Sequence, residues 1–194
     1  MSFNRFTADA TAMLLIDHQV GTMGWVHSIA FEEMKRNALM LAQVARIMRI
    51  PVVLTSSMEE YAQGPLLSEL ATILPEAFAA RIKRMGIVNA MDDEHFAAAV
   101  RALGRRKLVI AGVTNDVCTV FPALSLVGEG YDVQVVADAG GSPAKIADEM
   151  ALRRMERGGV TLTSTNQLVA ELVGNWTTAE GSQVVQLMMG ALQG

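Results

Sequence analysis

One stretch of the sequence, 107–126, constrains the fold most, because it predicts a strand, a tight turn and a helix in direct succession. Its continuous apolar run, 108–111, is typical of a strand buried on both faces of a parallel sheet. Gly112 then frees the backbone, and residues that cap helices or bend chains follow: Thr114, Asn115 and Asp116. An apolar series at helical spacing completes the unit: Val117, Val120, Phe121 and Leu124. A strand that leads directly into a helix favours a parallel α/β sheet.

The same alternation of strand and helix continues along the whole chain. Segments typical of strands lie at 11–16, 51–55, 79–84, 131–137 and 160–163. Segments typical of helices lie at 31–48, 66–74 (ending before Pro75), 92–103, 144–157 and 165–174. We therefore expect an α/β fold of three layers, with helices on both faces of a parallel sheet. We find no internal repeat or linker, so residues 1–194 are expected to form a single domain.

Composition and charge exclude several classes of protein. The 194 residues suit one domain with a full core, and the net charge of −4 includes no basic stripe for nucleic acid. No apolar run is long enough to span a bilayer, so we expect no membrane partner. The first residues, MSFNRFTADA, lack the apolar core of a signal peptide, and we expect a cytoplasmic protein.

The sequence contains no recognisable metal or cofactor motif. Its histidines, His18, His27 and His95, do not follow a paired metal-binding spacing. The pair Gly140 and Gly141 lacks the GxGxxG pattern of a phosphate loop, which also argues against a flavodoxin-like redox role. We therefore predict that the protein works without a metal or a cofactor.

Cys118 is the only cysteine, and it falls in the first turn of the helix predicted after the strand at 108–111. That turn presents unpaired backbone N–H groups and the positive end of the helix dipole, which favour the thiolate over the thiol. The same N–H groups could hold the oxyanion formed when a thiolate attacks a carbonyl. Cys118 is thus a candidate nucleophile, although a small buried hydrophobe is an equally open interpretation.

A carboxylate and a group of cations are expected at the same edge of the sheet. Asp17 ends the first strand, and open α/β sheets bind ligands at the carboxyl ends of their strands. A simple turn or cap is the alternative role for Asp17. The third strand carries Arg81, Lys83 and Arg84, and alternation places Arg84 on the opposite side from the other two. At most one of these sides can face a site.

Apolar residues suggest two further surfaces. Trp25, in the loop after the first strand, and Phe121, in the helix that carries Cys118, are candidate contacts for an apolar part of a small-molecule substrate. The tail at 176–194 predicts a last helix that is more apolar than a lone terminal helix should be. We expect this helix to lie at a subunit interface of a homo-oligomer.

Four segments carry a resemblance to a known family: LLIDHQ at 14–19, RIKRMGIVNAMDD at 81–93, AGVTNDVCTVFPALS at 111–125 and VVADAGGS at 135–142. Together they resemble the isochorismatase-like cysteine hydrolases, and within them the YcaC-type hydrolases of unknown substrate. The resemblance covers residues from about Thr11 to Val173. It implies a six-stranded, Rossmann-like parallel sheet of order 3-2-1-4-5-6. It also implies stacked tetramers, so a tetramer or an octamer is expected.

The resemblance further implies a triad of an aspartate, a cation and a cysteine. Asp17 and Cys118 match the family pattern directly. The cation matches Arg84, and Lys83, one residue away, is the alternative. Because a guanidinium does not deprotonate, Arg84 would orient Asp17 and stabilise charge rather than relay a proton.

Two further features follow from the comparison with this family. Its non-proline cis peptide corresponds to the bond between Val113 and Thr114, and would aim the amides of Thr114 and Cys118 at one substrate oxygen. The metal-binding Asp-x-His segment of the nicotinamidase branch is replaced here by TSSMEEY at 55–61. We therefore predict neither zinc nor nicotinamidase activity.

These observations predict a cysteine hydrolase that cleaves a C–N amide or ester bond of a small molecule through a thioester. Asp17 would take the thiol proton, and Cys118 would attack the carbonyl. Two alternatives stay open. One is a non-catalytic ligand-binding or scaffold oligomer on the same fold, and the other is vinyl ether hydrolysis of the isochorismatase type, which uses the aspartate without a cysteine.

Overall fold

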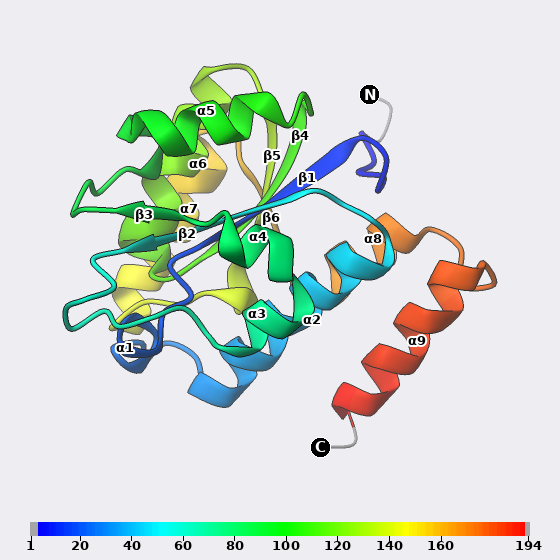
Figure 1. Cartoon of the computed structure of the whole chain (residues 1–194). Coiled ribbons are helices and arrows are strands. Elements are labelled where there is room, and N and C mark those ends of the chain that lie inside the picture. The colour runs from blue at the N-terminus through cyan, green and yellow to red at the C-terminus, as the bar shows by residue number, and fades with distance from the viewer. Residues whose placement is uncertain (1–3, 193–194) are drawn as a thin grey trace.

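A six-stranded parallel sheet forms the centre of the molecule (Figure 1). The computed structural model describes residues 4–192. The strands are β1 Thr11–Ile16, β2 Val52–Ser57, β3 Ile82–Arg84, β4 Lys107–Gly112, β5 Asp132–Val136 and β6 Thr161–Thr163. Their order in the sheet is β3-β2-β1-β4-β5-β6, and every neighbouring pair is parallel. This confirms the expected α/β fold and the strand order that the resemblance implies.

Helices cover both faces of the sheet and give the molecule three layers (Figure 1). One face carries α2 Phe31–Ile47, α3 Glu69–Ile73, α4 Pro75–Ala79, α8 Thr165–Val173 and α9 Ala179–Leu192. The opposite face carries α5 Glu94–Ala102, α6 Val120–Gly128 and α7 Lys145–Arg157. The connections include a short helix, α1 Val20–Gly24, and single turns: η1 Ala90–Asp92, η2 Asn115–Thr119 and η3 Ala137–Ala139.

The central strand β1 supplies side chains to both halves of the core. All six of its residues are buried, and alternation sends Leu15 toward the α2 side and Leu14 toward the α6 side. Ile16, the last residue of β1, lies opposite Thr55 of β2 and Gly112 of β4. The carboxyl ends of these strands therefore lie side by side, which brings together the polar residues that follow them.

Two local predictions need correction. A helix was expected to stop before Pro75, but Pro75 itself begins the next helix, α4. Proline is tolerated there because the first N–H groups of a helix have no partner within the helix. The helix after β4 begins with a wide turn, η2, in which the Thr119 N–H bonds the Thr114 carbonyl five residues earlier. Regular helix starts only at Val120, so Cys118 lies in the wide turn rather than in α6.

The terminal helix α9 lies outside α2 and α8 (Figure 1). Val184 is fully buried against the core, and Leu187 and Met188 pack partly against it. Met189 remains 55% exposed. The expected subunit contact of residues 176–194 stays a prediction, and residues 193–194 lie outside the described residues. None of the described helices combines the length and apolarity needed to span a bilayer.

Candidate active site

A cavity of about 310 Å³ opens at the carboxyl edge of the sheet, and Asp17, Arg84 and Cys118 line it together. Asp17 follows β1, Arg84 ends β3, and Cys118 lies in η2 after β4. The chain starts at β1 and adds β2 and β3 toward one edge of the sheet. It then returns to the other side of β1, where it adds β4, β5 and β6 toward the opposite edge. The cavity thus lies at the topological switch point, where open α/β sheets bind ligands.

Arg84 is held through all three nitrogens of its guanidinium group. Its side chain is 1% exposed, and Nη2 pairs with Oδ2 of Asp17. Nε donates to Oγ1 of Thr55 at 3.0 Å, and Nη1 donates to the Ile87 carbonyl at 2.6 Å. These contacts fix the cation beside Asp17 and leave it no exposed edge.

Lys83, the alternative cation, lies away from the cavity. Its side chain is 52% exposed, and Nζ pairs with Glu59 at 2.9 Å. Arg81 also pairs with Glu59, at 2.7 Å. Alternation along β3 explains why Arg84 points to the opposite side. Of the two cations considered from the sequence, the structure brings Arg84 to Asp17.

Asp17 is a buried carboxyl group with one oxygen held by Arg84. The residue is 1% exposed, and its Oδ1 accepts no hydrogen bond from the described residues. Its backbone has a φ of 57°, a left-handed conformation that turns the chain where β1 ends. Burial raises the pKa of Asp17 above its ordinary value, although the neighbouring Arg84 and, to a smaller extent, the Cys118 side chain oppose the shift. A carboxylate with a raised pKa is a better proton acceptor than an exposed aspartate.

The pKa of the Cys118 thiol is also raised, which corrects the expectation of a stabilised thiolate. Burial is the largest cause, and the nearby Asp17 carboxylate adds to it. The nearby Thr114 backbone and the charge of Arg84 lower the pKa of the thiol by less. At neutral pH the site therefore holds a thiol, whose proton must leave before the sulfur can attack.

Close backbone packing fixes the turn that carries Cys118. A Cβ on Gly140 would lie 2.3 Å from the Gly112 carbonyl oxygen, so only glycine allows the backbone at 140 to lie this close to the end of β4. The Asn115 N–H donates to the Gly141 carbonyl at 2.8 Å, and its side chain donates to Asp148 at 3.0 Å. The paired glycines thus serve packing around η2.

The other residues expected to contact a substrate have different positions. Trp25, 44% exposed, and Thr114 line the cavity. Val113 is fully buried and does not line it, and its peptide bond to Thr114 is cis. Phe121 also does not line the cavity, contrary to expectation. It is partly buried and packs against the core on the α6 side, with the Arg154 guanidinium 5.4 Å from the ring centre.

Sequence reasoning missed two polar residues of this cavity. Gln19 is buried, donates to the Ser57 carbonyl at 2.9 Å and accepts from the Ser57 N–H at 2.8 Å, which ties the segment after β1 to the end of β2. Asp116 lines the cavity, although its sequence context suggests only a cap. The position of Gln19, three residues past a buried strand, is the signal that could have indicated its place.

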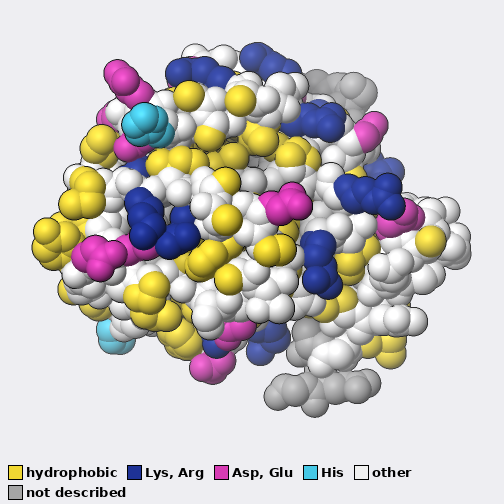
Figure 2. Space-filling model, viewed as in Figure 1, with side chains coloured by type: hydrophobic (Ala, Val, Ile, Leu, Met, Phe, Trp, Pro, Cys, Tyr) yellow, Lys and Arg dark blue, Asp and Glu magenta, His cyan; other side chains and the backbone are white. Residues whose placement is uncertain are grey.

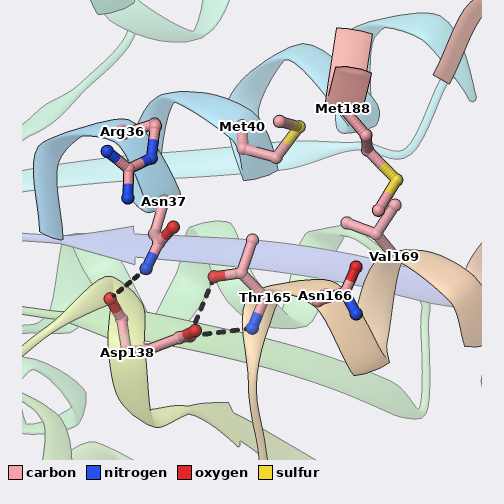
Figure 3. A pocket seen from close by; sticks show the side chains of 8 residues that line it. All are labelled: Arg36, Asn37, Met40, Asp138, Thr165, Asn166, Val169 and Met188. Carbon is pink, nitrogen blue, oxygen red and sulfur yellow. Dashed lines mark hydrogen bonds between the residues drawn. The ribbon is translucent and has the colours of Figure 1, made fainter. Parts of the chain in front are cut away.

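A second cavity, of about 280 Å³, lies between α2, α8 and α9 and shares no lining residue with the first (Figure 3). Asp138, which follows β5, accepts from the N–H and the hydroxyl of Thr165 at 2.7 and 2.8 Å. Asn37 donates to the Asp138 carbonyl at 2.8 Å. Asp138 therefore holds the first residue of α8 in place, and this second carboxylate at a strand end has a structural role.

Histidines do not contribute a metal site in the part of the chain that the structure describes. Across residues 4–192, no three His, Cys, Asp or Glu side chains are grouped so that they could hold a metal ion. His18 is buried beside the Ala139 carbonyl, 2.8 Å from its Nε2, and burial lowers its pKa to about 4. The expected independence from a metal stays a prediction.

The fold and the cavity define a class of protein, a doubly wound α/β protein with a cysteine and a carboxyl group at its switch point. The Isochorismatase domain matches residues 11–167, and the chain belongs to this family of hydrolases. It is 39% identical over 172 residues to the probable hydrolase YcaC of Escherichia coli strain K12. That similarity covers 89% of this chain and 82% of the relative.

Two solved structures place the chain in the YcaC branch of the family. Pseudomonas aeruginosa YcaC, solved with hexane-2,5-diol and covalent acrylamide, has a TM-score of 0.92 at 36% identity, covering 98% of this chain and 95% of that one. Escherichia coli YcaC, described as an octameric hydrolase of unknown specificity, has a TM-score of 0.89 at 36% identity. The match covers 98% of this chain and 97% of that one.

Proposed function

We propose that this protein is a cysteine hydrolase that cleaves a C–N amide or ester bond of a small molecule. The observation that carries the proposal is the meeting of Asp17, Arg84 and Cys118 in one cavity at the sheet's switch point. A half-buried thiol beside a buried carboxylate forms a nucleophile and base pair, and such pairs make covalent intermediates.

The first half of the reaction transfers the acyl group to sulfur. Asp17 accepts the thiol proton, the Cys118 sulfur bonds to the substrate carbonyl carbon, and the carbonyl oxygen becomes an oxyanion. The backbone N–H groups of Thr114 and Cys118 stabilise this oxyanion. As the C–N or C–O bond breaks, Asp17 returns the proton to the leaving group and a thioester remains.

The second half of the reaction releases the acid. Asp17 takes a proton from water, the water oxygen attacks the thioester carbon, and the sulfur leaves and regains a proton. Arg84 holds Oδ2 of Asp17 through both halves, so the carboxylate stays oriented and its charge stays balanced.

A relative's chemistry supports a reactive thiol in this cavity. Pseudomonas aeruginosa YcaC carries covalent acrylamide, and acrylamide is an electrophile that adds to thiols. We expect Cys118 to be the residue that reacts in this chain, because it is the only cysteine and it lines the cavity.

A screen of small amides, esters and acyl donors, read by intact mass, tests the proposal. A productive substrate should give a transient acyl adduct on Cys118 and a released acid. Cys118→Ala should lose the adduct and the hydrolysis, and Cys118→Ser should lose at least ~10³-fold in rate. Full activity in either variant contradicts the thioester mechanism, whereas turnover of a vinyl ether by Cys118→Ala would favour the isochorismatase-type alternative. A Cys118 that forms no adduct with any compound would favour a non-catalytic ligand-binding role.

We also propose that the chain assembles as a homo-oligomer, a tetramer or an octamer. The octameric description of Escherichia coli YcaC supports this, as does the exposed Met189 on the outer side of α9. The proposed substrate is a small molecule, because the cavity of about 310 Å³ is the size of small-ligand sites.

A further inference from the structure

We infer that Asp116 makes this cavity selective for amides without negative charge, and that its carboxylate receives an N–H group of the bound substrate. The inference rests on the proposed hydrolase function and names the substrate class of that same site. Three observations carry it: the balance of charges in the cavity, the place of the half-buried Asp116 carboxylate in its lining, and an apolar wall.

The charges that line the cavity are unequal. Its lining contains two carboxylates, Asp17 and Asp116, and one cation, Arg84, among the described residues. Arg84 is 1% exposed and uses its three nitrogens for Asp17, Thr55 and Ile87. A substrate carboxylate would therefore meet no accessible cation among these lining residues, and Asp116 would repel it.

Asp116 lies two residues before Cys118 on the same wide turn, and both side chains line the cavity. Asp116 is half-buried, and its Oδ1 atom is closed to solvent and has no partner in the range 4–192, so Oδ2 is the oxygen that a ligand in the cavity can reach. A carboxylate oxygen that faces a cavity accepts a hydrogen bond from a ligand that brings a donor there. An amide N–H or an ammonium group supplies that donor, and a carboxylate or an ester oxygen does not.

Much of the remaining wall is apolar and includes Trp25, Met58, Ile87, Val88 and Val117. Val88 is 56% exposed, at the mouth of the cavity. Figure 2 shows apolar side chains gathered at the left of the molecule, where the loops after β2 and β3 lie in Figure 1. Such a wall binds hydrocarbon. The substrate class is thus a small neutral or cationic amide with an apolar part.

Acrylamides of different charge test this inference even while the natural substrate is unidentified. The probes are N-isopropylacrylamide, which is neutral, a trimethylammonium-propyl acrylamide, and an acrylamido-methylpropanesulfonate. In each reaction an S–C bond forms at the β-carbon, the C=C bond becomes single, and the thiol proton ends on the α-carbon. The rate of Cys118 alkylation is followed by intact mass and divided by the rate of the same probe with glutathione.

We expect the neutral and cationic probes to react about 100-fold faster than the anionic probe after this correction. Asp116→Asn should reduce the difference to less than about tenfold, and Asp116→Glu should retain it. Glu149→Gln, on the exposed side of α7, removes the same charge outside the cavity and should leave the ratio unchanged.

Two outcomes overturn the inference while leaving the proposed hydrolase function intact: equal alkylation of the wild type by all three probes, or an unchanged ratio in a folded Asp116→Asn protein. The wild-type series alone decides the matter if melting curves show that Asp116→Asn does not fold. Failure of every probe to alkylate Cys118 would instead contradict the proposed function, and the inference would fall with it.

Discussion

Cys118 keeps its proton at neutral pH because burial and the neighbouring Asp17 raise the pKa of its thiol. Asp17 acts on the sulfur in two opposed ways. Its negative charge holds the proton on the sulfur at rest, and its oxygen accepts that proton when the attack begins. The two groups therefore titrate as a pair. Removing the charge of Asp17 should change thiol ionisation and catalysis in opposite directions.

The variant Asp17→Asn tests this coupling. We expect Cys118 to react with iodoacetamide at lower pH in the variant, because the nearby charge that raises the thiol pKa is gone. Hydrolysis of any substrate found should fall by about 10²–10⁴-fold, because the base is lost. The measurements are the pH profile of alkylation by intact mass and the turnover rate. An alkylation midpoint that does not move would show that Asp17 does not control the thiol.

Adjacent cations on β3 should differ sharply in their contribution to stability. Arg84→Met leaves the buried Asp17 without its ion pair, so we expect the free energy of unfolding at pH 7 to fall by about 3–5 kcal/mol. Lys83→Met is the matched control; this side chain is 52% exposed, and its loss should cost less than about 1 kcal/mol. Urea unfolding measures both. Similar losses in the two variants would contradict the placement of Arg84.

The edge strand β3 has three residues and pairs only with β2, so side chains from outside the sheet help to hold it. Glu59, in the loop after β2, binds Arg81 and Lys83 on either side of Ile82. Its hydrogen bond from Arg81, with those from Ser56 and Lys83, lowers the pKa of Glu59 to about 2. A carboxyl group with a lowered pKa stabilises the fold above its ordinary pKa, and this contribution disappears as the pH falls toward 2.

Glu59→Gln should therefore destabilise the protein in a pH-dependent way. We expect a loss of about 1–2 kcal/mol at pH 7, because two charge-assisted contacts are weakened. The difference between wild type and variant should shrink as the pH falls from the ordinary value of 4.5 toward 2, where the wild-type carboxylate also takes up a proton. Urea unfolding at pH 7, 4 and 2.5 measures the difference. A constant difference across this range would exclude Glu59 ionisation as its cause.

The six strands and the end of β1 were predictable from sequence, because apolar runs locate buried strands and Asp17 directly follows one, whereas α4 was not expected and β3 begins only at Ile82. The order of the sheet came only from the family resemblance, since local patterns carry no information on which strands are neighbours. Alternation separated Arg84 from Lys83, but which side faces the cavity depends on the assembled sheet. Phe121 was misplaced because the wide turn η2 changes the direction in which the start of α6 presents its side chains. The raised thiol pKa depends on burial, which the sequence around Cys118 does not reveal.

At the scale of the whole molecule, α9 lies on the outside of the fold and has an inner and an outer face (Figure 1). Val184 is fully buried on the inner face, whereas Met189 is 55% exposed, and Trp176, just before the helix, is 41% exposed. Truncation at Trp176 would remove both the cover of the core and the proposed subunit contact. A smaller species after truncation would then have two possible causes, so single substitutions on each face give a sharper test.

Met189→Glu places a charge on the outer face of α9 and leaves the buried contact of Val184 in place. If this face holds subunits together, the variant should elute as a smaller species than the wild type at equal concentration, because burying an unpaired carboxylate opposes assembly. Val184→Glu is the comparison, since it disrupts the core of the chain itself and should lower the melting temperature directly. Size exclusion with light scattering gives the mass of each species, and thermal melting reports the fold. A Met189→Glu protein with the mass of a wild-type oligomer would show that subunits associate through another surface.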